Sequence, residues 1–172
     1  MDFLNMAKER YSVRKFKDIP VEKEKLEMVL QAGHVAPTAC NIQPQRILVI
    51  QSEDALNKLK NATRCHFDAP CAILVCSDND QCWTRKDDGA KSGAIDASIV
   101  TTHMMLQAWS LGLGTTWVMH FNPENMRSEF NIPANYEPVA LLVMGYAAED
   151  AQPMDLHTQY KNEDEIVYYD TF

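Results

Sequence analysis

Short apolar runs and helical repeats alternate along the 172-residue chain. Runs of β-branched and other apolar residues are typical of buried strands, whereas apolar residues recurring every three to four positions indicate helices. Strands are predicted at Arg46–Gln51, Cys71–Ser77, Thr115–Met119 and Val139–Met144. Helices are predicted at residues 2–9, 21–33, 52–61, 94–111 and 123–130, with Gly33 as the C-cap of the second. No repeat or Gly/Ser linker divides the chain, so residues 1–172 are expected to form a single domain.

The predicted helix over residues 94–111 carries non-polar side chains on two faces. One stripe consists of Ile95, Ile99, Thr102, Leu106 and Trp109. The second, with smaller residues, consists of Ala97, Thr101, Met104 and Ala108. A helix with only a narrow polar face is usually buried on two sides, by the core of its own chain and by a second element or molecule. We favour a second copy of the chain as the outer cover over a merely central helix, and expect Gly112 and Gly114 to end the helix.

Composition and charge narrow the class of protein. The first ten residues contain no long apolar segment, so we expect neither export nor membrane spanning, and therefore a cytoplasmic protein. Five cysteines, with no C-x-x-C pair and no secretion signal, are expected to be free thiols. A formal net charge of −8 argues against a general nucleic-acid surface, although five of the sixteen Lys and Arg residues lie in the first seventeen positions. A local anion site is therefore predicted near the N-terminus.

Residues 10–14, Arg10-Tyr11-Ser12-Val13-Arg14, are the first candidate site. Two arginines four positions apart with a serine between them offer forked charged donors and a neutral donor, which suits a phosphate monoester. The alternative is a solvated basic loop.

The second candidate is the loop over residues 36–44, APTACNIQP, which leads into a predicted strand. Pro37 and Pro44 stiffen it, while Thr38, Asn41 and Gln43 supply donors and acceptors for a polar heterocycle or a ribityl chain. An ordinary helix-to-strand connection remains the alternative. The five histidines stand at no spacing that would pair two ligands, so no metal site is expected.

These two motifs, followed in order by GLGTTWV at residues 112–118 and VMGYAAE at 143–149, resemble the nitroreductase family. The resemblance runs from about Glu9 to Tyr169. It implies an α+β fold with a central mixed sheet flanked by helices, and an intertwined homodimer with two FMN sites at its interface.

The resemblance also implies the site residues. Arg10, Ser12 and Arg14, together with Tyr11, would bind the FMN phosphate and the pyrimidine end of the flavin. The partner subunit would contribute Pro37, Thr38, Ala39 and Asn41, with Gln43 near them. The segment Thr116, Trp117, Val118, Met119 and His120 would lie against the isoalloxazine, with a backbone N–H facing flavin N5. No catalytic side chain is assigned, because the flavin carries the reaction.

The chain departs from the family pattern at three places. Gln45 replaces a frequent Trp after Pro44, and Cys40 stands where Gly is common. The tail after Gly145 usually carries Arg or Lys over the phosphate, whereas residues 154–157 here read Met-Asp-Leu-His. Either His157 or Lys161 takes that role, or the phosphate relies on Arg10 and Arg14.

The activity implied by the resemblance is ping-pong transfer of hydride from NADH or NADPH, through FMN, to a small electron-poor acceptor such as a quinone or a nitroaromatic. Two alternatives remain at the level of the sequence. One is a flavin-binding redox sensor or storage protein with little turnover. The other is a specialised reductive dehalogenase or flavin-consuming lyase of the same fold. Those groups have longer chains with lid insertions that hold the substrate, and this chain has little room for such an insertion outside residues 78–92.

Overall fold

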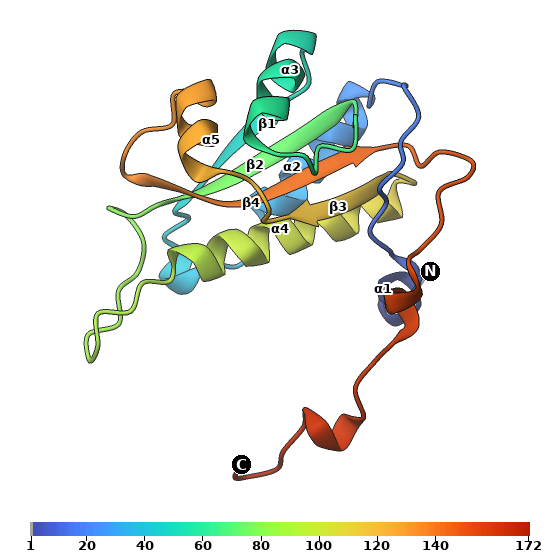
Figure 1. Cartoon of the computed structure of the whole chain (residues 1–172). Helices are drawn as coiled ribbons and strands as arrows, with labels where there is room; N and C mark the ends of the chain where they lie inside the picture. The colour runs from blue at the N-terminus through green and yellow to red at the C-terminus, as the bar shows by residue number, and fades with distance from the viewer. Residues whose placement is uncertain (1) are drawn as a thin grey trace.

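An antiparallel four-stranded sheet forms the centre of the structure, a computed structural model that describes residues 2–172 (Figure 1). In spatial order its strands are β1 (Gln45–Ile50), β2 (Cys71–Asp78), β4 (Tyr136–Gly145) and β3 (Gly114–Val118). β1 and β3 are therefore the two edges. A parallel bridge between Ser12 and Thr115 continues the sheet beyond β3. The resemblance implied a mixed sheet, whereas all four strands are antiparallel to their neighbours and the bridge at Ser12 is a single isolated parallel pairing.

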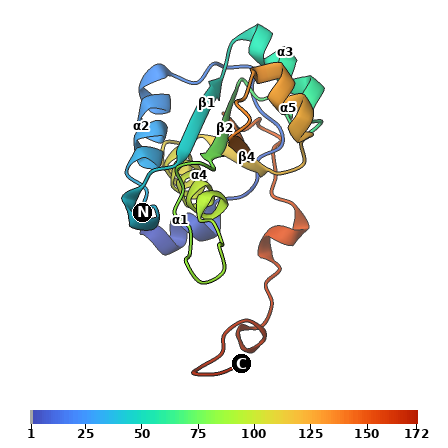
Figure 2. The same cartoon turned by 90° about the vertical axis from the view of Figure 1, so that its left-hand side faces the viewer.

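Helices cover both faces of the sheet, which gives the expected α+β architecture (Figure 2). α2 (Lys23–His34) and α4 (Gly93–Ser110) pack on one face, and α3 (Glu53–Ala62) and α5 (Pro123–Phe130) on the other. α1 (Phe3–Glu9) lies against α4. β2 is buried along its whole length because it is central and covered on both faces. This double cover explains why its sequence is a continuous apolar run and does not alternate.

The predicted helices and strands are all present, with ends that shift by a few residues. Ser52 caps α3 by accepting the Ala55 N–H at 3.2 Å, and Gly112, with φ 78°, ends α4 as predicted. The prediction that Gly33 is a C-cap is wrong. α2 continues through His34, and a Cβ on Gly33 would lie 2.9 Å from the Met104 side chain. Gly33 thus lets α2 and α4 approach closely. Gly114 also does not end a helix, because it begins β3.

α4 has the two faces that its sequence predicts. The stripe of smaller residues is fully buried against the sheet, at Ala97, Thr101, Met104 and Ala108. The other stripe faces outward: Ile95 is 64% exposed, and the remaining members are only partly covered. Within one chain, therefore, the second apolar face lacks a complete cover.

The five cysteines are free thiols, as expected. Burial raises the pKa of the Cys71 thiol to about 12 and that of Cys76 to about 11, so both stay protonated in the core. Across residues 2–172, no group of three or more His, Cys, Asp or Glu side chains is arranged to hold a metal ion. None of the helices in this range is long and apolar enough to cross a bilayer.

Candidate functional site

The Arg10–Arg14 segment runs along the outer edge of β3. The Val13 N–H donates to the Thr115 carbonyl at 2.9 Å, and the Thr116 hydroxyl donates back to the Val13 carbonyl. Val13 is fully buried, and a Cβ on Gly114 would lie 2.6 Å from it, so the glycine admits this close approach. Since neighbouring side chains of extended backbone point to opposite sides, Ser12 and Arg14 face away from Val13.

A cavity of about 400 Å³ opens beside this segment and joins it to the C-terminal tail. It is lined by Ala7, Arg10, Tyr11, Ser12, Arg14, Met154, Leu156, His157 and Tyr160. Burial lowers the pKa of the Arg10 guanidinium below its ordinary value, and the nearby Tyr160 acts in the opposite direction. Arginine still remains charged at neutral pH. Two guanidinium groups, a hydroxyl and an imidazole therefore converge on one space, a donor set that suits a phosphate.

The tail reaches this cavity through contacts with Tyr11. The Tyr11 ring meets the Trp109 ring edge-on, with centroids 5.5 Å apart, and the His157 ring at 6.2 Å. The Tyr11 hydroxyl donates to the Ala151 carbonyl at 3.4 Å. Of the two residues that could replace the usual basic contact, His157 is the one that lines the cavity.

The backbone of β3 continues the site along the sheet edge. Because the Thr115 carbonyl accepts from Val13, the polar backbone groups of Thr115 point away from β4. Backbone direction alternates along a strand, so the N–H of Trp117 points the same way, and Met119 directly follows the end of β3. The Met119 side chain is 71% exposed. The Trp117 N–H thus lies at the edge of the strand where the resemblance expects the isoalloxazine.

The second predicted loop is clamped at both ends. The Asp96 carboxylate, in the first turn of α4, accepts the Ala39 N–H at 2.9 Å. The Thr38 hydroxyl accepts the Gln43 N–H at 3.1 Å, and the Arg46 guanidinium donates to the Gln43 carbonyl at 3.3 Å. The loop is thus a defined structure with its own anchors. The Gln43 side-chain amide donates to the Asn41 carbonyl at 3.4 Å, which is the local bonding expected of an ordinary connection.

Within this clamped loop, three non-glycine residues take left-handed backbone angles: Cys40 at φ 51°, Asn41 at 54° and Gln43 at 57°. Asparagine tolerates this region well, whereas side chains such as cysteine are strained there. The preference for Gly at position 40 in the family pattern thus has a conformational reason.

The two loops do not meet within one chain. The Thr38–Gln43 loop contacts the start of α4 through Asp96, whereas Tyr11 contacts its end through Trp109. Asp96 and Trp109 are thirteen positions apart in the helix, a distance of about 20 Å at the rise of an α-helix. The predicted residues therefore form two half-sites, one at each end of α4.

Three contact residues were missed at the level of the sequence. Asp96 holds the Ala39 N–H, and the Thr63 hydroxyl donates to the His120 carbonyl at 2.5 Å. The Cys65 sulfur lies 4.0 Å from Nδ1 of His120. An acidic residue inside an otherwise apolar helix was a visible signal for Asp96. Thr63 and Cys65 carried no such signal, because only the packing of α3 against α5, with the Asn122 N–H donating to the Ala62 carbonyl, brings them to His120.

Comparison with known proteins identifies the family and the fold of the chain. The sequence model of the nitroreductase family matches residues 7–70 and 65–146, and the chain belongs to that family. The crystal structure of a nitroreductase family protein from Clostridium difficile 630 superposes with a TM-score of 0.95 at 49% identity over 100% of both chains.

Two further relatives have names that describe an activity. An FMN-dependent nitroreductase from Clostridium difficile R20291 has a TM-score of 0.79 at 27% identity, over 99% of this chain and 100% of that one. A Bacillus subtilis protein named FMN reductase [NAD(P)H] is 25% identical over 90% of this chain and 73% of its own length.

Cys40→Gly is expected to raise the free energy of unfolding by about 0.5–1 kcal/mol. The variant removes the strain of a left-handed cysteine, which exceeds the extra backbone entropy that glycine loses on folding. Urea unfolding of the cofactor-free protein measures the change. Cys82→Gly is the control and should lower stability, since Cys82 does not have a positive φ. A loss of stability in Cys40→Gly would contradict the strain argument.

Proposed function

We propose that this protein is an FMN-dependent oxidoreductase that transfers hydride from NADH or NADPH to a small electron-poor acceptor by a ping-pong mechanism. The observation that carries the proposal is the cavity in which Arg10, Ser12, Arg14 and His157 converge beside the exposed edge of β3. The names of the relatives, an FMN-dependent nitroreductase and an FMN reductase [NAD(P)H], support the same chemistry.

The donors present fit FMN better than a dinucleotide. The cavity holds a cluster suited to one phosphate monoester, and the β3 edge continues from it with backbone N–H groups that a flavin ring can accept from. When bound, FMN supplies the hydride chemistry. The protein's groups then have three tasks: Arg10 and Arg14 neutralise the phosphate, β3 orients the ring, and backbone donors stabilise charge that grows on reduction.

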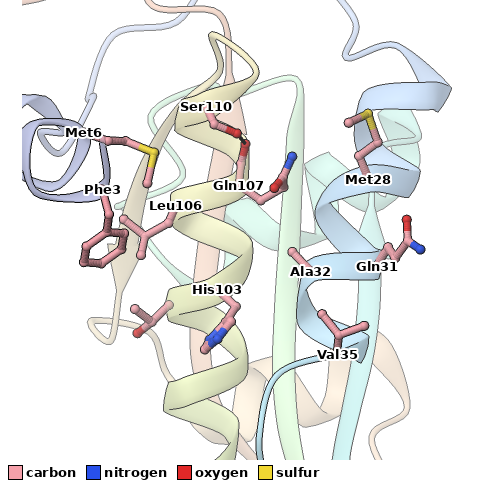
Figure 3. A pocket seen from close by; sticks show the side chains of 11 residues that line it. Phe3, Met6, Met28, Gln31, Ala32, Val35, His103, Leu106, Gln107 and Ser110 are labelled. Carbon is pink, nitrogen blue, oxygen red and sulfur yellow. Dashed lines mark hydrogen bonds between the residues drawn. The ribbon is translucent and has the colours of Figure 1, made fainter. Parts of the chain in front are cut away.

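We further propose that a second copy of the chain covers the outward face of α4. A groove of about 720 Å³ lies between α1, α4 and α2, and Figure 3 shows Phe3 and Met6 on one side, Leu106 and His103 in the middle, and Met28 and Val35 on the other. Along α4 it adjoins a second hollow at Ile95 and Ile99. So long an apolar surface is typical of a homodimer interface.

The C-terminal arm, residues 159–172, supports an intertwined dimer. It leaves the body of the subunit as an extended segment (Figure 1). Its exposed large hydrophobic residues are Tyr160, Ile166, Val167, Tyr168, Tyr169 and Phe172. An exposed arm with this composition is expected to bury its side chains on a partner, and a second copy supplies an apolar surface for it.

A two-fold axis that pairs the α4 helices antiparallel joins the half-sites. The end of one α4, beside Tyr11, then meets the start of the other, beside Ala39. Each FMN would contact Arg10, Ser12 and Arg14 of one subunit and Thr38, Ala39 and Asn41 of its partner. Because the half-sites of a single chain lie about 20 Å apart, only a dimer can bring two of them together around one FMN.

The proposed function is tested by FMN titration, followed by steady-state oxidation of NADH or NADPH with a quinone. Binding of FMN in preference to FAD and repeated turnover are expected. A single reduction without turnover would identify a redox sensor, and failure to bind FMN would overturn the proposal.

Arg10→Ala and Arg14→Ala are each expected to weaken FMN binding by about 1.5–3 kcal/mol, the range for a hydrogen bond to a charged group. Calorimetric titration measures the affinity. Lys17→Ala is the matched control, since Lys17 is a nearby cation that pairs with Glu149 and does not line the cavity. Unchanged affinity in both arginine variants would mean that the Arg10–Arg14 segment is a solvated basic loop that does not bind the phosphate.

The composite site predicts complementation between chains. Homodimers of Arg14→Ala or of Asn41→Ala have two damaged sites. A mixed dimer of the two chains has one site with both substitutions and one intact site, because each FMN draws on both subunits. Differently tagged, co-expressed chains should therefore give a heterodimer with about half of the wild-type activity and one tightly bound FMN. Activity no higher than in either homodimer would show that the two residues act within one chain.

A further inference from the structure

Asp96 is a buried carboxylate that the fold does not pair with a cation. It is 2% exposed, and none of the ion pairs formed among residues 2–172 includes it. A buried charge without a partner costs stability, so its hydrogen bonds must offset that cost. They come from the Ser92 hydroxyl at 2.7 Å and the Ala39 N–H at 2.9 Å. The Ser92 bond is local to α4, whereas the Ala39 bond reaches 57 residues back along the chain.

The Ala39 bond holds the loop where its conformation is least favourable. Ala39 directly precedes Cys40 and Asn41, both with left-handed backbone angles, and such angles persist only where neighbouring contacts enforce them. Asp96 fixes this end of the loop, and Arg46 fixes the other end through the Gln43 carbonyl. Without Asp96, the partly buried Ala39 N–H loses its acceptor and the left-handed turn loses an anchor.

We propose that Asp96 is a positioning residue that shapes the Thr38–Gln43 loop for the FMN site of the partner subunit. The proposal rests on the composite site proposed above. Asp96 is buried and directly follows Ile95, which lies on the outward face of α4. The same helical turn therefore carries both the proposed dimer contact and the anchor of the loop. In a composite dimer each chain contributes its loop to one FMN site and its Arg14 to the other. Loss of Asp96 in one chain therefore damages the first of these sites and leaves the second intact.

The affinity of FMN for three variants tests the positioning role. Asp96→Ala should weaken FMN binding about ten-fold, the effect of leaving a partly buried N–H without its acceptor. Asp96→Asn should recover most of the affinity, because the amide oxygen still accepts from Ala39. Thr101→Val is the matched control, since Thr101 is a buried polar residue of the same helix. Its hydroxyl donates to the Ala97 carbonyl one turn earlier in α4 and does not reach the loop. Equal losses in Asp96→Ala and Thr101→Val would overturn the proposal.

Heterodimers then separate a positioning role from a general structural one. An Asp96→Ala chain paired with an Arg14→Ala chain should bind one FMN tightly per dimer. The same Asp96→Ala chain paired with an Asn41→Ala chain should bind none tightly, because the loop of each chain is then defective. Bound FMN is counted from the flavin absorbance after gel filtration, independently of turnover.

The outcomes distinguish the two proposals. If the Arg14→Ala and Asn41→Ala pair complements but the Arg14→Ala and Asp96→Ala pair does not, the role of Asp96 is refuted and the composite site stands. If the first pair also fails to complement, the composite site itself is refuted.

Discussion

The rigid separation imposed by α4 is the constraint on which the rest of the structure depends. An 18-residue helix spans the sheet with one predicted binding loop at each end. A helix cannot fold back on itself, so the loops stay about 20 Å apart however the side chains move. The exposed apolar stripe of the same helix offers the means of joining them, because an antiparallel partner helix would bring its opposite end alongside.

The proposed phosphate site has an arrangement that could accommodate the departure from the family pattern in the tail. The residues at 154–157 lack the usual arginine or lysine, yet the short helix at Asp155–Thr158 brings His157 to the cavity beside Arg10. A half-buried Arg10, with the pKa of its guanidinium lowered by burial, is positioned to be neutralised by an anion. The charge that the tail lacks is thus concentrated in the N-terminal segment, where the backbone bonds to β3 keep it in place.

The Thr38–Gln43 loop, at the other end of α4, has a strained backbone that is held in place by hydrogen bonds. Three left-handed residues in the Thr38–Gln43 loop would not adopt one conformation unaided. Asp96, the Thr38 hydroxyl and Arg46 each bind one backbone group of the loop. A buried carboxylate and a strained turn both cost stability, and the hydrogen bonds that Asp96 makes offset part of that cost.

Local pattern was sufficient to predict the helices, the strands, the free cysteines and the two faces of α4, because each depends on residue spacing and burial within a short window. The same pattern misjudged Gly33, whose role depends on Met104, seventy-one positions away in the chain. The two candidate motifs were also evident in the sequence. Their separation, the choice of His157 over Lys161 at the cavity, and the link from Asp96 to Ala39 were decided only by the tertiary structure. Each of these depends on which distant segments pack together, and neither periodicity nor motif spacing encodes that packing.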